Sequence, residues 1–215
     1  MSEHDHPHDG TPPPDEAGPL TYHQTMEIAV RELLIEKGVI TADEVRAAIE
    51  DMDSRTPARG ARVVARAWTD PDFKERLLAD GPAACLEMGI DVSPALLAVV
   101  ENTDGVHNAI VCTLCSCYPR PLLGLPPSWY KSAAYRSRMV REPRSVLDEF
   151  GLELGEDVAV RVHDSTAEMR YLVLPQRPAG TEGMTEDELA ALVTRDCMIG
   201  VAVPSVNRTT SPTPA

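Results

Sequence analysis

Residues 111–119 read VCTLCSCYP, which places three cysteines, Cys112, Cys115 and Cys117, within six positions. This spacing is typical of metal binding or thiol chemistry rather than of a disulfide framework. A structural zinc site would need a fourth ligand, from Cys85, Cys197 or a histidine brought in by the fold, and an iron–sulfur cluster has the same shortfall. A thioredoxin-like redox pair would use Cys112 and Cys115 and would leave Cys117 without a role.

A tight loop around one ion is another arrangement that suits this spacing. All three sulfurs would face the ion, together with the backbone nitrogens of Ser116 and Cys117 after these amides lose their protons. Because only a strongly Lewis-acidic ion favours that deprotonation, this arrangement implies a trivalent metal rather than zinc. Three sulfurs and two nitrogens leave one position open for water or substrate, as a catalytic site requires.

Strand patterns accompany the cysteine stretch. Residues 108–112 form a short apolar run that predicts a buried strand ending at the cysteines. Valines alternate with polar residues over 158–162, which predicts a half-buried strand. Residues 164–166 supply turn chemistry before a further strand over 170–174, and we expect these two strands to pair.

Helix signals lie on both sides of the strands. A helix is predicted over residues 143–150, closed by Gly151, and another after the capping box of Thr185 and Glu188. The sequence therefore predicts an α+β protein, in which an N-terminal helical arm is followed by a layered α/β domain that carries the Cys-rich metal-binding loop.

The N-terminal part predicts amphipathic helices. Apolar residues recur at helical spacing over 21–37, before Gly38, and the capping box of Thr41 and Glu44 opens a second helix. Asp70 and the following proline begin a third helix near 73–79, which the Gly-Pro pair at 81–82 stops. We expect an acidic, His-containing disordered leader over 1–20, the helical arm over 21–80, the catalytic domain over 81–205 and a frayed tail over 206–215.

Composition excludes several classes of partner. The chain has 215 residues and a net charge of −14, with no local cluster of Lys and Arg, so nucleic acid and membrane surfaces are poor partners. It has no apolar run of membrane-spanning length and no signal peptide, so a cytoplasmic location is expected. His4, His6 and His8 alternate in the leader, where they are consistent with transient metal binding or with a solvated tail.

The cysteine stretch resembles the metal-binding signature of nitrile hydratase alpha subunits. The resemblance extends over most of the chain, through LIEKG at 34–38, ENT at 101–103, LGLPP at 123–127, WY at 129–130, VREPR at 140–144, LPQRPAGT at 174–181 and VTR at 193–195. It implies a subunit that hydrates nitriles to primary amides.

The resemblance also implies a role for each residue of the loop. It makes Cys112, Cys115 and Cys117 thiolate ligands and the main-chain nitrogens of Ser116 and Cys117 amide ligands. Cys115, as the sulfinic acid, and Cys117, as the sulfenic acid, would act in catalysis together with Ser116. Thr113 and the tyrosine after the loop resemble the cobalt members, which favours one non-corrin Co(III) per chain over Fe(III).

The resemblance implies partners as well. A separate beta subunit would complete the active site in an α2β2 assembly, so this chain alone would be inactive, and an activator protein would load the cobalt. The gamma subunit of thiocyanate hydrolase, which converts thiocyanate to carbonyl sulfide and ammonia, is an alternative because residues 118–121 and 194–197 are similar to that family too. A non-catalytic metal-binding module is a second alternative.

We expect the remaining candidate residues to have structural roles, and for some of them a functional role is an alternative. Cys85 and Cys197 are expected to be buried small hydrophobes. His107 is expected to be a polar residue at a strand edge, or to lie beside the metal ligands, and His163 is expected to be solvated. Trp129 and the tyrosine after it either line the substrate pocket, as the resemblance implies, or pack in the core or at a subunit interface.

Overall fold

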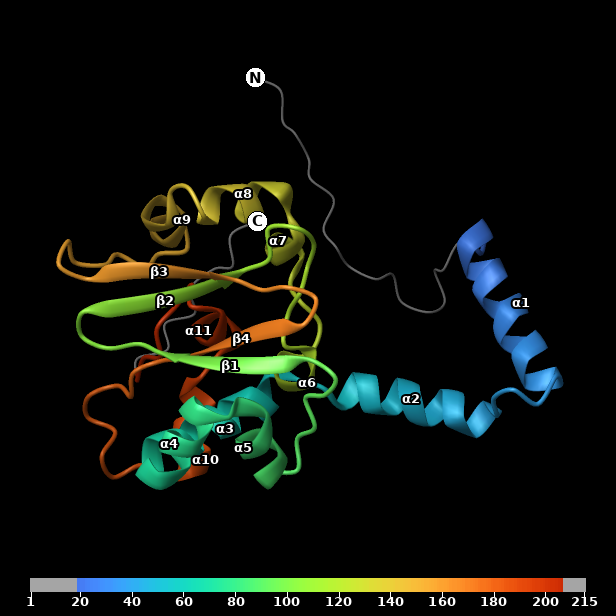
Figure 1. Ribbon diagram of the computed structural model, residues 1–215, viewed down its shortest axis with the longest axis horizontal. Helices are drawn as coiled ribbons and strands as arrows, with labels where there is room; N and C mark the ends of the chain where they lie inside the picture. Colours follow the sequence, from blue (N-terminus) through green and yellow to red (C-terminus); the bar gives the residue numbers. More distant parts are fainter. Residues whose placement is uncertain (1–18, 207–215) are drawn as a thin grey trace, which may run out of the picture. The chain divides into compact units, whose positions relative to one another are not determined.

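The computed structural model describes residues 19–206 of the chain (Figure 1). The expected leader, with its three histidines, and the expected tail lie almost entirely outside these residues. The chain forms two compact units, Met1–Glu50 and Asp51–Ala215. No helix in the described part of the chain is long and apolar enough to cross a membrane.

The first unit contains helix α1 (Tyr22–Glu36) and most of helix α2 (Ala42–Ser54). Thr21 caps α1 in a capping box with Gln24, which the sequence reasoning missed. The predicted capping box at α2 is confirmed, because the Thr41 amide donates to Glu44 at 2.7 Å and the Glu44 amide donates to the Thr41 hydroxyl at 3.1 Å. Neither helix has a buried residue, and Met26, Val30 and Leu33 of α1 and Ile49 and Met52 of α2 are exposed.

The second unit holds four strands and nine helices among its described residues. The strands are β1 (Leu96–Glu101), β2 (Val106–Val111), β3 (Ala159–Asp164) and β4 (Met169–Leu174). The helices are α3 (Pro57–Thr69), α4 (Pro71–Ala79), α5 (Gly81–Glu87), α6 (Arg120–Leu123), α7 (Ser128–Lys131), α8 (Ala133–Met139), α9 (Pro143–Glu149), α10 (Glu186–Leu192) and α11 (Arg195–Ile199).

The strands form two parallel pairs. β1 pairs with β4, from Leu96 opposite Met169, and β2 pairs with β3, from Val106 opposite Ala159. Figure 1 shows β2 beside β4, with α3, α4, α5 and α10 on the β1 side and α7, α8 and α9 on the β3 side. Helix α11 packs on β2 and β4. Helices thus cover the strand layer, and the expected α+β architecture is confirmed.

The expected pairing of the strands around residues 164–166 is wrong. The chain connects β3 to β4 through residues 165–168, one residue later than the predicted turn begins, but β3 and β4 each pair with a strand that lies more than fifty residues earlier in the chain. The buried run Leu172–Leu174 explains why β4 pairs with β1 and not with β3. A strand covered on both faces belongs in a parallel sheet rather than in a half-exposed hairpin. Strand β1 and helix α3 were not predicted.

The second unit begins earlier than the boundary expected at residue 81. Helices α3 and α4 supply Val63, Val64, Phe73 and Leu77 to its core, and each of these side chains is at most 2% exposed. These helices therefore belong to the α/β unit rather than to an arm. The Gly-Pro pair at 81–82 follows the end of α4, as predicted, and it also begins the next helix, α5.

A buried polar network joins β1, β2 and α11. His107 is 4% exposed, and its Nε2 donates to the Gly200 carbonyl at 2.8 Å while its Nδ1 accepts from Asn102 at 3.2 Å. The side-chain oxygen Oδ1 of Asn102 also accepts from the backbone N–H of Asn108 at 2.7 Å. Burial lowers the pKa of His107, which favours the neutral ring that these bonds require. His107 is therefore a buried structural residue and not one at a strand edge.

His163 extends the network to β3. Its Nε2 lies 2.9 Å from Oδ1 of Asn108, and its ring packs at 5.0 Å from the Tyr171 ring. The expected solvated role is wrong, because the parallel register brings β3 against β2 and half buries this side chain.

Candidate metal centre and adjoining cleft

The three cysteines of the loop converge on one point. Strand β2 ends at Val111, and the chain then turns so that the sulfurs of Cys112 and Cys115 lie 3.4 Å apart and those of Cys115 and Cys117 lie 3.3 Å apart. All three sulfurs lie within 4.8 Å of one another, the one such group of His, Cys, Asp or Glu found between residues 19 and 206. The loop is thus folded as a three-thiol site.

The sulfur spacing distinguishes two coordination geometries. For metal–sulfur bonds of about 2.3 Å, sulfurs at a tetrahedral angle lie about 3.8 Å apart and sulfurs at a right angle about 3.3 Å apart. The two measured separations, 3.4 and 3.3 Å, match the right angle. Cys85 and Cys197 are buried outside the cluster and supply no fourth thiol. The thiols therefore fit an ion with right-angled ligands better than tetrahedral zinc.

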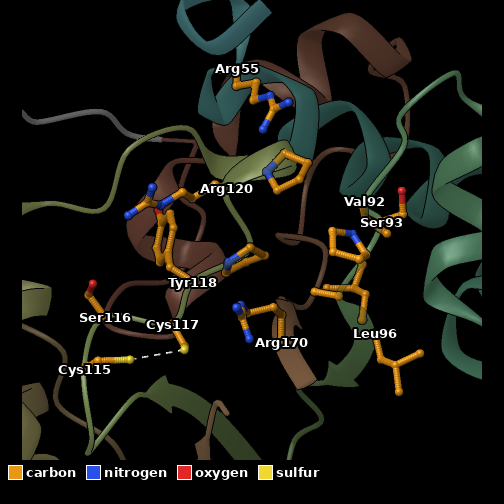
Figure 2. A pocket seen from close by; sticks show the side chains of 15 residues that line it. Arg55, Val92, Ser93, Leu96, Cys115, Ser116, Cys117, Tyr118, Arg120 and Arg170 are labelled. Atoms are coloured by element: carbon orange, nitrogen blue, oxygen red, sulfur yellow. Dashed lines mark hydrogen bonds between the residues drawn. The ribbon is translucent and has the colours of Figure 1, made fainter. Parts of the chain in front are cut away.

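Exposure and thiol pKa differ along the loop. Cys112 is buried, Cys117 is half-buried and Cys115 is exposed. Hydrogen bonds from the Cys117 and Cys112 thiols lower the pKa of Cys115 to about 7, while burial raises the pKa of Cys117. The Arg170 guanidinium, which Figure 2 shows beside the Cys117 sulfur, acts to lower the pKa of Cys117. The Cys115 thiol is thus more readily available as a thiolate at neutral pH than the Cys117 thiol.

Asp164, at the end of β3, fixes the beginning of the loop. Its carboxylate accepts the Thr113 amide at 2.9 Å and the Thr113 hydroxyl at 2.6 Å. The parallel register places Asp164 opposite Val111, so it lies beside the first cysteine. The sequence reasoning assigned Asp164 only to a turn, because nothing in the residue pattern gives the register of a parallel pair.

Aromatic side chains bind the backbone of the loop and of the strand that precedes it. The Tyr130 hydroxyl donates to the Cys117 carbonyl at 2.9 Å, and the Tyr135 hydroxyl donates to the Ile110 carbonyl at 2.8 Å. Trp129 packs against Tyr135 and Phe150 with ring centroids 4.9 and 4.8 Å away. Of the two alternatives for residues 129 and 130, core packing is therefore what the structure shows, and Tyr130 adds a direct bond to the loop.

A cleft of about 360 Å³ opens beside the outer part of the loop (Figure 2). It is lined by Arg55, Ala95, Cys115, Ser116, Cys117, Arg120 and Arg170, by the apolar residues Val92, Leu96 and Leu97, and by Ser93, Pro94, Tyr118, Pro119 and Pro121. Figure 2 shows the Ser116 hydroxyl directed away from the Cys115 and Cys117 sulfurs. The backbone of Ser116, rather than its hydroxyl, is therefore the part of this residue that lies near the thiols.

The two other cysteines have the structural roles that were expected. Cys85 lies in α5 and Cys197 in α11, and both are at most 1% exposed. Burial raises the pKa of each thiol, to about 12 for Cys85, so both remain neutral.

We expect Asp164→Ala to lower the metal affinity of the loop by about 10- to 100-fold, the usual cost of losing a group that orients a metal ligand. The reason is that the Thr113 amide and hydroxyl both lose their acceptor. Asp164→Asn keeps one acceptor and should lose less. Metal titration of the purified protein measures the change. Asp148→Ala, which removes an exposed carboxylate on α9, should retain full affinity, and an equal loss in both alanine variants would contradict the assigned role.

Comparison with known proteins places these features in a family context. A sequence model of the nitrile hydratase alpha chain matches residues 21–202. The chain is 56% identical over 183 residues to the low-molecular weight cobalt-containing nitrile hydratase subunit alpha of Rhodococcus rhodochrous, covering 82% of this chain and 86% of that subunit.

Thiocyanate hydrolases are similar as well. The chain is 47% identical over 193 residues to the thiocyanate hydrolase subunit gamma of Thiobacillus thioparus, covering 84% of this chain and 79% of that subunit. The solved structure of a recombinant thiocyanate hydrolase with partially modified cobalt centres superposes with a TM-score of 0.84 at 44% identity, covering 91% of this chain and 96% of that one.

Proposed function

Because the chain belongs to the nitrile hydratase alpha-chain family, we propose that it is the cobalt-carrying subunit of an enzyme that hydrates nitriles to primary amides. The observation that carries this proposal is the convergence of the Cys112, Cys115 and Cys117 sulfurs within 4.8 Å of one another beside an open cleft, with the Cys115 sulfur at right-angle spacing from each of the other two. A structural metal site would be closed, whereas this loop leaves Cys115 exposed next to the cleft.

Five donor atoms of the loop would hold the metal. They are the sulfurs of Cys112, Cys115 and Cys117 and the main-chain nitrogens of Ser116 and Cys117. A bound Co(III) ion supplies Lewis acidity toward a nitrile or a water molecule. We propose that Cys115 is the sulfinic acid and Cys117 the sulfenic acid, because both thiols line the cleft, where an oxidant can reach them, and the lowered pKa of Cys115 favours its thiolate.

Side chains of this chain shape the space where the nitrile would bind. Val92, Leu96 and Leu97 give the cleft an apolar wall. Asp164 and Tyr130 hold the two ends of the loop, through Thr113 and the Cys117 carbonyl. Cys115, Ser116 and Cys117 are the proposed catalytic residues because all three belong to the proposed metal-binding loop and line the cleft.

We propose that a beta subunit completes the site, in an α2β2 assembly in the cytoplasm, with a separate activator that loads the cobalt. Exposed apolar side chains support a partner. Leu114 in the loop is 85% exposed and Leu125 is 71% exposed, while α1 exposes Tyr22, Met26, Val30 and Leu33. Residues 21–50 would then serve as an arm that contacts this partner.

Metal analysis tests the proposal most directly. The chain is co-expressed with its beta partner in cobalt-supplemented medium, and the assembly is analysed for metal and by mass spectrometry. We expect about one cobalt per chain and three added oxygens on the peptide that contains Cys112–Cys117. Hydration of uncharged nitriles should accompany this loading. Zinc with three unmodified thiols would contradict the catalytic role and would favour a non-catalytic metal-binding module.

Hydrolysis of thiocyanate is a second candidate function. It is favoured by the 47% identity to a thiocyanate hydrolase gamma subunit and by the arginines that line the cleft. Release of carbonyl sulfide and ammonia from thiocyanate, without hydration of any uncharged nitrile, would favour this function over the first.

A further inference from the structure

Three side chains at the end of the metal loop and the start of α11 carry buried polar atoms that no protein group pairs. In the part of the chain that the structure describes, five buried side-chain nitrogen or oxygen atoms have no hydrogen-bond partner. Three of the five are the Tyr118 hydroxyl, Nε of Arg195 and Oδ1 of Asp196. Because an unpaired buried polar atom is unfavourable, such atoms in a native protein indicate a bound group, which is most often water.

The guanidinium and the carboxylate at the start of α11 lie close together without a direct bond. Nε of Arg195 is 3.9 Å from Oδ1 of Asp196, which is too far for a hydrogen bond. Two hydrogen bonds of about 2.8 Å from one water oxygen would reach both atoms and meet at about a right angle. Arg195 is also anchored at its other end, because its Nη1 donates to the Leu125 carbonyl at 3.3 Å.

Tyr118 supplies the third atom. This side chain is 3% exposed, and its ring packs against the Tyr130 ring with centroids 5.2 Å apart. Burial raises the pKa of Tyr118, so its hydroxyl stays protonated and can donate. The charges of Arg195 and Asp196 both act on this pKa, in opposite directions. The hydroxyl is therefore within electrostatic range of both residues of α11.

From these three atoms we propose that one buried water molecule joins Tyr118 to Arg195 and Asp196, and that this bridge positions the end of the metal loop on α11. The water would accept from the Tyr118 hydroxyl and from Nε of Arg195, and it would donate to Oδ1 of Asp196. Three bonds are the usual number for a buried water. The three side chains are positioning residues, and their role rests on the proposed metal-binding function of the loop.

The bridge would act on the last donor residue of the loop. Tyr118 directly follows Cys117, whose sulfur and main-chain nitrogen are proposed metal donors. The Cys117 carbonyl already accepts from the Tyr130 hydroxyl at 2.9 Å. With the bridge, the peptide between Cys117 and Tyr118 is held at its carbonyl and through the side chain that follows it. Rotation of this segment, which would move the Cys117 donors, is then restricted from two sides.

A crystal structure of the full chain with its beta partner, at a resolution that shows ordered water, tests the bridge directly. We expect one water within hydrogen-bond distance of the Tyr118 hydroxyl, Nε of Arg195 and Oδ1 of Asp196. A direct hydrogen bond between Arg195 and Asp196, with no water at these atoms, would overturn this inference.

Tyr118→Phe tests whether the hydroxyl is bonded. This variant keeps the ring and its packing against Tyr130 and removes only the hydroxyl. Loss of an unpaired buried hydroxyl would leave the urea midpoint of unfolding unchanged or raise it, whereas loss of a bridged one should lower it. We expect a lower midpoint. In a double-mutant cycle, Asp196→Ala should add little to the effect of Tyr118→Phe, because both changes remove the same bridge.

Metal titration of the same proteins tests the positioning role. We expect Tyr118→Phe and Asp196→Ala each to lower the cobalt affinity of the loop by about tenfold, the lower end of the usual effect of losing a group that orients a metal ligand. Asp196→Asn keeps a side-chain oxygen as acceptor and should retain most of the affinity. Tyr22→Phe, which removes an exposed hydroxyl of α1, is the matched control and should change neither the midpoint nor the affinity.

The outcomes separate this inference from the proposed function. An unchanged or higher urea midpoint in Tyr118→Phe would overturn the bridge. A lower midpoint with unchanged cobalt affinity would overturn the positioning role. Neither the crystal structure nor the unfolding measurement depends on nitrile turnover, so a bridge that is present in a protein forming no amide would overturn the proposed function alone.

Discussion

Cys112→Ala is expected to abolish cobalt binding and to lower nitrile hydration more than about a thousandfold, the scale of losing one member of a group that acts as a unit. Cys112 is the buried member of the cluster, and its sulfur lies 3.4 Å from that of Cys115. Without it, only two thiols remain, at the edge of an open cleft. Because soft thiolate ligands hold the cobalt ion in such a loop, we expect the ion to be lost. Cobalt per chain and amide formation measure both effects.

The matched control is the same substitution outside the loop. Cys85→Ala removes an equally buried cysteine in α5 whose thiol lies outside the cluster. It should retain a full complement of cobalt and lose only some stability. Full cobalt loading in the Cys112→Ala protein would contradict the assigned ligand set, whatever its activity.

The metal centre was accessible from the sequence because its donors are contiguous. Cys112, Cys115 and Cys117 lie on one short loop, so their spacing alone brings the sulfurs together once the chain turns. Helix boundaries at Gly38 and Gly151 and the capping boxes at Thr41 and Thr185 were predictable for the same reason, since each signal lies within a few residues of the structure it determines.

Features that depend on tertiary register were not accessible. Asp164 reaches Thr113 only because β3 pairs in parallel with β2, a pairing between residues about fifty positions apart. The cleft likewise combines Arg55, Arg120 and Arg170 from three distant segments. Local patterns placed a turn between the segments of β3 and β4 and still gave the wrong strand partners, because a turn is compatible with either topology.

Gly200→Ala is expected to destabilise the folded second unit by about 3 kcal/mol, from left-handed strain together with overpacking. Gly200 ends α11 with φ of +89°, and a Cβ at this position would lie 2.1 Å from the Asn108 carbonyl oxygen and 2.8 Å from the Cα of Ala109. These are backbone atoms of β2 that cannot rotate away. The Gly200 carbonyl also accepts from His107 at 2.8 Å, so any shift of α11 disturbs the buried polar network.

A second glycine distinguishes the destabilisation caused by the close contact from that caused by the left-handed backbone conformation. Gly151 has φ of +79°, but a Cβ there would meet nothing within 4 Å, so Gly151→Ala should cost only the left-handed strain of about 1 kcal/mol. Urea unfolding of both variants measures the difference. An equal loss of unfolding free energy in both variants would show that α11 can shift away from β2 at no cost, and it would contradict the assigned close contact. Because β2 leads directly into Cys112, the Gly200 variant should also load less cobalt than the Gly151 variant, which would connect the packing of α11 to the metal loop.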